Sequence, residues 1–412
     1  MQRIMKHQIP VIFRQPIIAE RNYPMTSPKQ LLIMLLSLVA VGLMAAIFYS
    51  PVWWVSLTAP NYPKEAFPDG VRINFHMNGV FNGCKKVEKS EITEDEALDC
   101  VHEMDTINHY VGMYPIASGG VVEKAFSPFL MSFLGVMIIG FMCRIPKIRV
   151  VILTLGFGAI AIWMYATYYS ANGLRFQNSG YLEGLVSALD QDTEKETAAA
   201  GMSSADAVIA RLKASLENSG VKEKNSAEQE SDKEASLIHL ENSFIKDQER
   251  KPPAEREKWN GSGAQMLAWH YQKNLGRYFN NQAEIIPMVK KMSMAGHIMF
   301  WGIIAAMILL IFGARKNSGF LYWLLILVPL ALPFFFIIEY SGWLWWYGHN
   351  LNEMGAFTVK PFMPTVFGDG KVAQFTTHSY PNIGFGLMLL LAIDLAIVAL
   401  LRRRQLRDEG ES

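Results

Sequence analysis

Long apolar blocks separated by polar segments are the dominant pattern along the 412-residue chain. A helix needs roughly 20 mostly apolar residues to cross the hydrocarbon core of a bilayer, where it also pairs its own backbone polar groups. Six blocks meet this requirement: 31–49, 125–142, 150–168, 292–312, 320–338 and 383–401. The pattern therefore predicts an all-α polytopic membrane protein with six transmembrane helices, the first of them an uncleaved signal anchor.

Lysine and arginine are concentrated in the polar segments that six crossings would place on one side of the membrane. The amino-terminal segment, 1–30, holds five of them against Glu20 alone, and the tail, 402–412, holds four. Because such residues flank spans on the cytoplasmic side, both termini are predicted to be cytoplasmic. Three longer segments would then form a periplasmic cap: 50–124, 169–291 and 339–382.

The first outer segment contains signals for both a strand and a helix. Apolar and polar residues alternate over 71–77, which predicts a strand. Ser90 or Thr93 can cap a helix that runs from Glu94 to about Asn108 and has an acidic first turn. The segment is therefore predicted to fold as a small α+β unit.

Two of the three cysteines, Cys84 and Cys100, lie in this α+β unit, on the side of the membrane where disulfides persist. A disulfide between them would close a loop of about 17 residues and contribute about 3 kcal/mol. A metal held by the same pair is the alternative. Cys143 falls near the cytoplasmic end of the second span, out of reach of either.

The second outer segment, 169–291, is predicted to be a helical insert. Helical spacing of apolar residues indicates two surface helices, within 198–218 and 228–258, followed by an amphipathic helix at 265–279 that could lie along the membrane surface. No catalytic pattern is present in the insert. Its expected role is a docking surface for a partner, or a spacer.

The third outer segment, 339–382, is predicted to be nonhelical because of its Pro, Gly and Asn content. Together with the first segment it carries histidines and methionines, whose imidazole and thioether groups suit copper, particularly Cu(I). The candidate metal ligands are His109, Met113, His349, Met363 and His378, with Asn108, Tyr110, Tyr347 and Asn350 around them. Ordinary hydrogen bonding and packing of these side chains is the alternative.

Asp394, in the sixth predicted span, is the clearest acid within the membrane. An ionisable group in hydrocarbon is by default functional, so a proton or ion relay is one hypothesis, and pairing with a neighbouring helix is the other. The 38 Lys+Arg balance the 37 Asp+Glu, which argues against a nucleic-acid partner. Motifs for nucleotide, haem or hydrolase chemistry are absent from the sequence, so an enzyme with its own cofactor is not expected.

Several outer motifs resemble those of a little-characterised family of bacterial inner-membrane proteins, often encoded in nitrous-oxide-reductase gene clusters beside copper chaperones. The most specific is Ile-Asn-His-Tyr-Val-Gly-Met at 107–113, followed by Tyr-Gly-His-Asn-Leu-Asn at 347–352 and Ser-Tyr-Pro-Asn-Ile-Gly at 379–384. The resemblance covers the six spans with the first and third outer segments. It does not extend to the insert or to the acidic stretch between the cysteines.

The resemblance implies a membrane accessory protein for periplasmic copper handling or for maturation of a copper enzyme, with a copper chaperone or copper enzyme as partner. By the motif match, His109, Met113 and His349 would hold a transient copper ion. Two other hypotheses remain open. One is a non-catalytic structural subunit of a membrane respiratory or oxygenase complex, in which the motifs pack loops together; the other is a transporter that uses Asp394.

Overall fold

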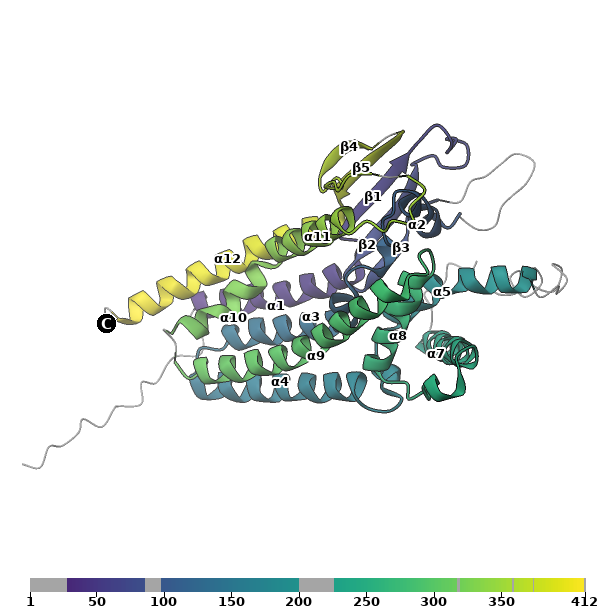
Figure 1. The fold of residues 1–412 in the computed structure, drawn as a ribbon. Helices are drawn as coiled ribbons and strands as arrows, with labels where there is room; N and C mark the ends of the chain where they lie inside the picture. Colours follow the sequence, from purple (N-terminus) through teal and green to yellow (C-terminus); the bar gives the residue numbers. More distant parts are fainter. Residues whose placement is uncertain are drawn as a thin grey trace, which may run out of the picture.

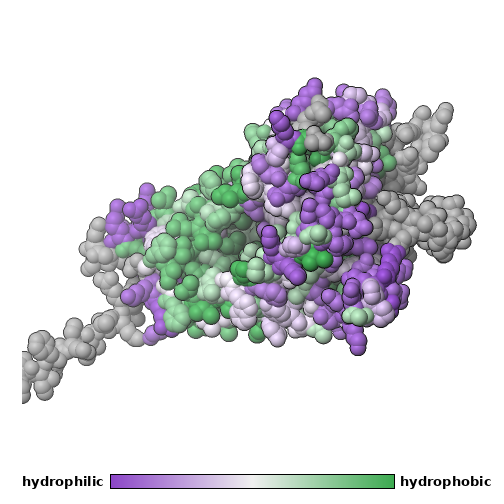
Figure 2. Space-filling view, in the orientation of Figure 1, coloured by the Kyte–Doolittle hydropathy of each residue, from purple (hydrophilic) through white to green (hydrophobic). Residues whose placement is uncertain are grey.

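The computed structural model describes residues 28–85, 98–199, 226–316, 319–357, 359–372 and 374–410. Within these ranges, five helices are long and apolar enough to cross a membrane, and a bent pair of helices would make a sixth crossing. The five are α1 (Pro28–Tyr49), α3 (Val121–Met142), α4 (Pro146–Tyr168), α9 (Gln282–Gly313) and α12 (Ile383–Gly410). They run side by side (Figure 1), and their surface is an apolar zone between two hydrophilic ends (Figure 2). This is the architecture of a polytopic membrane protein.

The fifth predicted span, 320–338, is not one straight helix. It is divided into α10 (Phe320–Leu330) and α11 (Leu332–His349), which are bent by 63°. Pro333 cannot donate a backbone hydrogen bond and its ring clashes with the carbonyl four residues earlier, so the helix breaks at this point. α11 then continues to His349, so the prediction that residues 339–349 are nonhelical was wrong.

A five-stranded antiparallel sheet covers one end of the helical bundle. Its strands are β1 (Trp53–Thr58), β2 (Val71–His76), β3 (Gly79–Asn82), β4 (Gly368–Val372) and β5 (Phe375–Pro381), in the order β3-β2-β1-β5-β4. The predicted strand at 71–77 is confirmed as β2. The pairing of β1 with β5, from Trp53 opposite Pro381 to Thr58 opposite Thr376, joins the first and third outer segments.

The helix α2 (Cys100–Tyr110) packs on this sheet through Cys100, Met104 and Ile107. A disulfide joins Cys84 to Cys100, whose Cα atoms are 6.0 Å apart, as the sequence predicted. The helix begins at Cys100 rather than at Glu94, because the side chain of Asp99 accepts hydrogen bonds from the N–H groups of Val101 and His102. The predicted caps, Ser90 and Thr93, lie outside the described residues.

The part of the insert that the structure describes is helical, as predicted. Its elements are η2 (Gly173–Phe176), α5 (Ser179–Ala199), α7 (Ser226–Glu249), η3 (Pro253–Glu255) and α8 (Gly263–Gly276). Most of the predicted helix at 198–218 lies outside the described residues. The residues of α8 that the sequence assigned to its apolar face, among them His270, Tyr271 and Leu275, are buried among neighbouring elements. We call the sheet, α2, the one-turn helix η1 (Ile116–Ser118) and the insert the cap.

The opposite end of the bundle, which we call the terminal end, holds the start of α1 and the end of α12, joined by an ion pair between Lys29 and Asp408. Two buried arginines satisfy carbonyl groups left unpaired at helix ends there. Arg402 donates to the carbonyls of Phe141 and Met142, at the end of α3, and Arg149 donates to that of Ala314 after α9. The positive charges therefore fix helix ends on the side opposite the cap.

Candidate functional site

The predicted ligand His109 lies in an aromatic environment at the end of α2. Its ring contacts Tyr110, Tyr278 and Phe279, with a centroid separation of 4.7 Å to Phe279. Its Nδ1 atom is buried and has no hydrogen-bond partner among the described residues. Burial also lowers the pKa of His109, so the imidazole is neutral at pH 7 and its nitrogen remains a potential acceptor or ligand.

The other predicted histidines have separate partners. His349 is exposed at the end of α11, where its ring stacks on Trp345 at 4.6 Å and its Nδ1 bonds to the Trp345 carbonyl. His378 lies on β5, with Nδ1 2.7 Å from Asp369 Oδ1, and this hydrogen bond lowers the pKa of Asp369. Met363 is 47% exposed and follows Phe362, whose N–H donates to the Gly348 carbonyl beside His349.

Met113 and the surrounding motif residues hold the outer segments together. Met113 is buried in the main apolar core. The N–H of Asn352 donates to the Gly112 carbonyl and that of Phe357 to the Tyr110 carbonyl. Gly112 has a φ of +81°, and a Cβ there would lie 2.6 Å from the Asn352 carbonyl oxygen, so only glycine fits. The motif at 107–113 thus meets the motif at 347–352 through backbone contacts.

The remaining predicted neighbours of the metal site also make structural contacts. Asn108 is buried, Tyr347 donates to the Pro115 carbonyl at 2.9 Å, and Asn350 donates to the Trp346 carbonyl. Within the described ranges, no group of three or more His, Cys, Asp or Glu side chains is placed to hold a metal ion. Each of the predicted ligands His109, Met113, His349 and His378 thus has contacts of its own in the fold.

Asp105 is a buried carboxyl in α2 that the sequence did not single out. Its Oδ1 accepts a hydrogen bond of 2.7 Å from the N–H of Ile116, which ties α2 to η1. Burial raises the pKa of Asp105 to about 7 and outweighs the backbone hydrogen bonds that favour the charged form. The contact between α2 and η1 therefore depends on the protonation state of Asp105.

Asp394 is buried in α12, and its Oδ2 atom has no hydrogen-bond partner among the described residues. Its location inside a span agrees with the sequence analysis. It does not line either of the two cavities described next, so neither of them connects it to a ligand.

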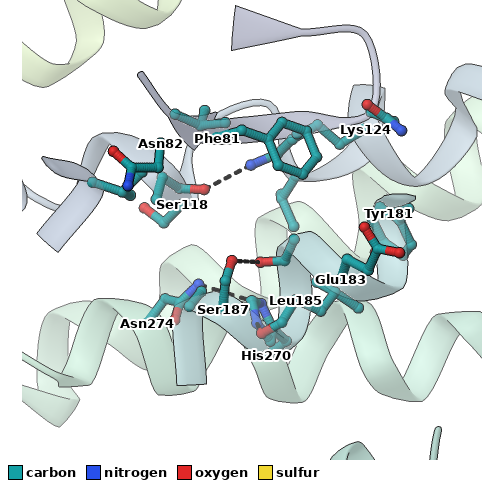
Figure 3. Close-up of a pocket in the computed structure, with 18 of the residues that line it drawn as sticks. Phe81, Asn82, Ser118, Lys124, Tyr181, Glu183, Leu185, Ser187, His270 and Asn274 are labelled. Atoms are coloured by element: carbon teal, nitrogen blue, oxygen red, sulfur yellow. Dashed lines mark hydrogen bonds between the residues drawn. The ribbon is translucent and has the colours of Figure 1, made fainter. Parts of the chain in front are cut away.

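A first cavity, of about 360 Å³, lies within the cap between β3, α2, α5 and α8. Polar side chains line it, and Lys124, Ser187, His270 and Asn274 bond to the protein itself (Figure 3). Lys124 donates to the Ala117 carbonyl at 2.7 Å, while the two ring nitrogens of His270 bond to the Leu185 carbonyl and to Asn274. Burial lowers the pKa of His270 to about 4, so this histidine is neutral. These hydrogen bonds hold the elements around the cap cavity together.

A second cavity, of about 480 Å³, lies where the spans meet the cap, and we call it the interfacial cavity. It is bounded by α3, α9, α10 and α11 on the membrane side and by β2 and β3 on the cap side. Most of its lining is apolar and includes Phe75, Leu130, Leu134, Met299, Phe335 and Trp343. Its volume lies within the roughly 300–1,000 Å³ range of small-molecule sites, which are mostly apolar with a few polar groups.

Three charged side chains meet at one point of the interfacial cavity, around Gly120. A Cβ on Gly120 would lie 3.6 Å from Glu339 Oε1 and 4.0 Å from both Glu123 Oε2 and Lys124 Cε. Gly120, with a φ of +60°, precedes α3 and leaves this point open. The Oε2 atom of Glu123 is buried and has no hydrogen-bond partner in the described chain. An apolar cavity thus contains a carboxylate oxygen that the protein does not satisfy.

Comparisons of the chain with protein-family models, with curated proteins and with solved structures found no match. The geometry of the cavities therefore carries the functional argument. In the sequence, Glu339 lies at the outer end of the fifth predicted span, and Glu123 and Lys124 end the first outer segment, where sequence analysis did not single them out. The signal available was the pair Gly119-Gly120, which precedes Glu123-Lys124 by two valines and is followed by an apolar block.

Proposed function

We propose that the protein binds an amphiphilic molecule, taken from the membrane, in the interfacial cavity. The observation that carries the proposal is the cavity itself, which has apolar walls at the level of the spans and the Glu123, Lys124 and Glu339 cluster below the cap. An amphiphile with one apolar chain and one polar head matches this division. The cavity lies between helices, where such a molecule would enter from the bilayer rather than from water.

The cap would then face the outside of the cell. The arginines of the terminal end support this orientation, because positively charged residues flank spans on the cytoplasmic side. A groove of about 440 Å³ between α1, α3 and α4 is a weaker candidate site, since it is lined by no carboxylate or lysine that could orient a polar head.

Filling the cavity tests the proposal. Leu130 and Leu134 line it from α3, and replacing both with Phe should occlude it. Leu155 and Ile162 on α4 are 70% and 73% exposed, so the same pair of changes there is a matched control on the lipid-facing surface. The probes are radiolabelled dodecylammonium and dodecanol, measured with protein in lipid nanodiscs.

We expect saturable binding of at least one probe to the wild type and to the control pair, and loss of that component in the Leu130→Phe/Leu134→Phe protein. Equal saturable binding to the occluded protein, or no saturable component in the wild type, would overturn the proposal. Thermal unfolding of each variant, followed by tryptophan fluorescence, shows whether the occluded protein is folded.

A second candidate is the copper-handling role implied by the family resemblance. One observation favours it: His109 combines a neutral imidazole with a buried, unpartnered Nδ1. His349 is a second, exposed candidate ligand, and the Phe362 N–H to Gly348 carbonyl hydrogen bond brings the chain at Met363 close to it. Cu(I) stoichiometry of the purified protein should fall in His109→Ala and should fall further when His349 is also replaced. Unchanged stoichiometry in the double variant would reject copper binding at these residues.

A further inference from the structure

The charge cluster of the interfacial cavity indicates what kind of polar head the ligand carries. Glu123, Lys124 and Glu339 all approach the same point above Gly120. Two carboxyl groups therefore face one ammonium group. When all three are ionised, the cluster has one negative charge in excess.

Lys124 does not cancel the charge of either carboxylate by direct contact. Its Nζ donates to the Ala117 carbonyl at 2.7 Å, on the side of the cap cavity. No ion pair within 4.0 Å joins Lys124 to Glu123 or to Glu339 in the part of the chain that the structure describes. The lysine thus bonds to the loop before α3, and it holds neither carboxylate in an ion pair.

An uncompensated carboxylate is costly in such surroundings. A charged group removed from water loses several kcal/mol of hydration unless a partner of opposite charge or several hydrogen bonds replace it. Glu123 Oε2 has neither water-exposed surface nor a protein partner. The partner that would satisfy it is a cation which also donates hydrogen bonds, placed where the apolar walls end.

We infer that the interfacial cavity selects amphiphiles whose head is an organic ammonium group. This inference rests on the proposed function and adds the chemical class of the ligand. The ammonium would lie between Glu123 and Glu339, and its apolar chain would extend along Leu130 and Leu134 of α3. Trp343 also lines the cavity and offers an aromatic face that stabilises a desolvated cation.

Chain-matched competitors test the inference. Dodecylammonium, dodecanol and dodecyl sulfate share one alkyl chain and differ only in the charge of the head. Each is titrated against a bound radiolabelled dodecyl probe in nanodiscs made of an uncharged lipid, so that membrane surface charge does not favour one head. Hydrogen bonds to charged groups contribute about 1.5–3 kcal/mol, so dodecylammonium should compete at least about tenfold better than dodecanol.

Glu123→Gln and Glu339→Gln should each reduce this preference for ammonium while leaving competition by dodecanol unchanged. Glu183→Gln is the matched control, because Glu183 is exposed and lines only the cap cavity. Equal competition by all three heads would overturn the inference and leave amphiphile binding intact. Failure of every competitor would instead overturn the proposed function. If one glutamine variant does not fold, competition by the three head groups on the wild type and on the other glutamine variant still tests the inference.

Discussion

Replacing Asp105 with asparagine should remove the loss of stability that this carboxyl causes in the cap between pH 4 and 7. Burial raises the pKa of Asp105 from 3.8 to about 7 in the folded protein. Above pH 4 the carboxyl ionises in the unfolded chain before it ionises in the folded one. The contribution of Asp105 to the free energy of unfolding therefore falls as the pH rises from about 4 to about 7 and levels off above that, while His270, whose pKa burial lowers from 6.5 to about 4, contributes in the opposite direction.

The magnitude follows from the shift. One pKa unit corresponds to about 1.4 kcal/mol, so a shift of about three units costs the wild type on the order of 4 kcal/mol at pH 8 relative to pH 4. Asparagine keeps a carbonyl oxygen that can accept the hydrogen bond from the Ile116 N–H, and it cannot ionise. Asp105→Asn should thus equal the wild type near pH 4 and exceed it at pH 8.

Thermal unfolding in detergent, followed by tryptophan fluorescence at pH 4.5, 6 and 8, measures this difference. The expected result is a melting temperature of Asp105→Asn that rises relative to that of the wild type as the pH increases from 4.5 to 8. Glu183→Gln, at an exposed position, controls for the loss of one carboxylate. Parallel pH profiles for the wild type and Asp105→Asn would refute the assignment of Asp105 as a buried, mostly neutral carboxyl at low pH.

Two further predictions concern the Cys84–Cys100 disulfide and the close backbone contact at Gly112. Replacing Cys84 and Cys100 together with serine should lower the free energy of unfolding by about 3 kcal/mol, since the two cysteines are 16 residues apart in the sequence. A reducing agent should lower the melting temperature of the wild type but not of this variant. Gly112→Ala should destabilise the protein by about 1–3 kcal/mol, because alanine is strained at a φ of +81° and its Cβ would contact the Asn352 carbonyl. Gly302→Ala is the control and should not destabilise the protein, because no atom lies within 4 Å of the new Cβ. Equal melting temperatures for the two alanine variants would contradict the close approach at Gly112.

The membrane architecture was predictable because each span is a long apolar block. The observed helices α1, α3, α4 and α12 contain the predicted blocks and extend them by a few residues at the ends. Short-range patterns were also sufficient for β2, whose apolar and polar residues alternate, and for the Cys84–Cys100 pair, which lies within one outer segment. In these cases the information is local in the sequence.

What the sequence could not predict depends on contacts between distant residues. Strand β5 pairs with β1 although Trp53 and Pro381 are separated by almost the whole described chain, and neither strand has a turn signal pointing to the other. Helix α11 extends to His349 because Tyr340, Leu344 and Tyr347 bury one face, which outweighs the helix-breaking residues that follow. Tertiary packing thus overrides the local preference.

The candidate site shows the same limit. Glu123 and Lys124 read as the polar flank of a span, and only the bend between α10 and α11 brings Glu339 to them. The histidines, by contrast, were predicted to be metal ligands because they fall in two of the outer segments. In the fold His349 stacks on Trp345 and His378 pairs with Asp369, and these local partners could not be read from the sequence.

Photo-crosslinking is the most direct test of amphiphile binding in the interfacial cavity. A dodecylammonium probe with a diazirine in its chain, activated in nanodiscs and mapped by mass spectrometry, should label Leu130, Leu134 and Trp343, and excess unlabelled dodecylammonium should suppress this labelling. Labelling confined to lipid-facing positions such as Leu155 and Ile162, with no suppression by excess ligand, would contradict the account.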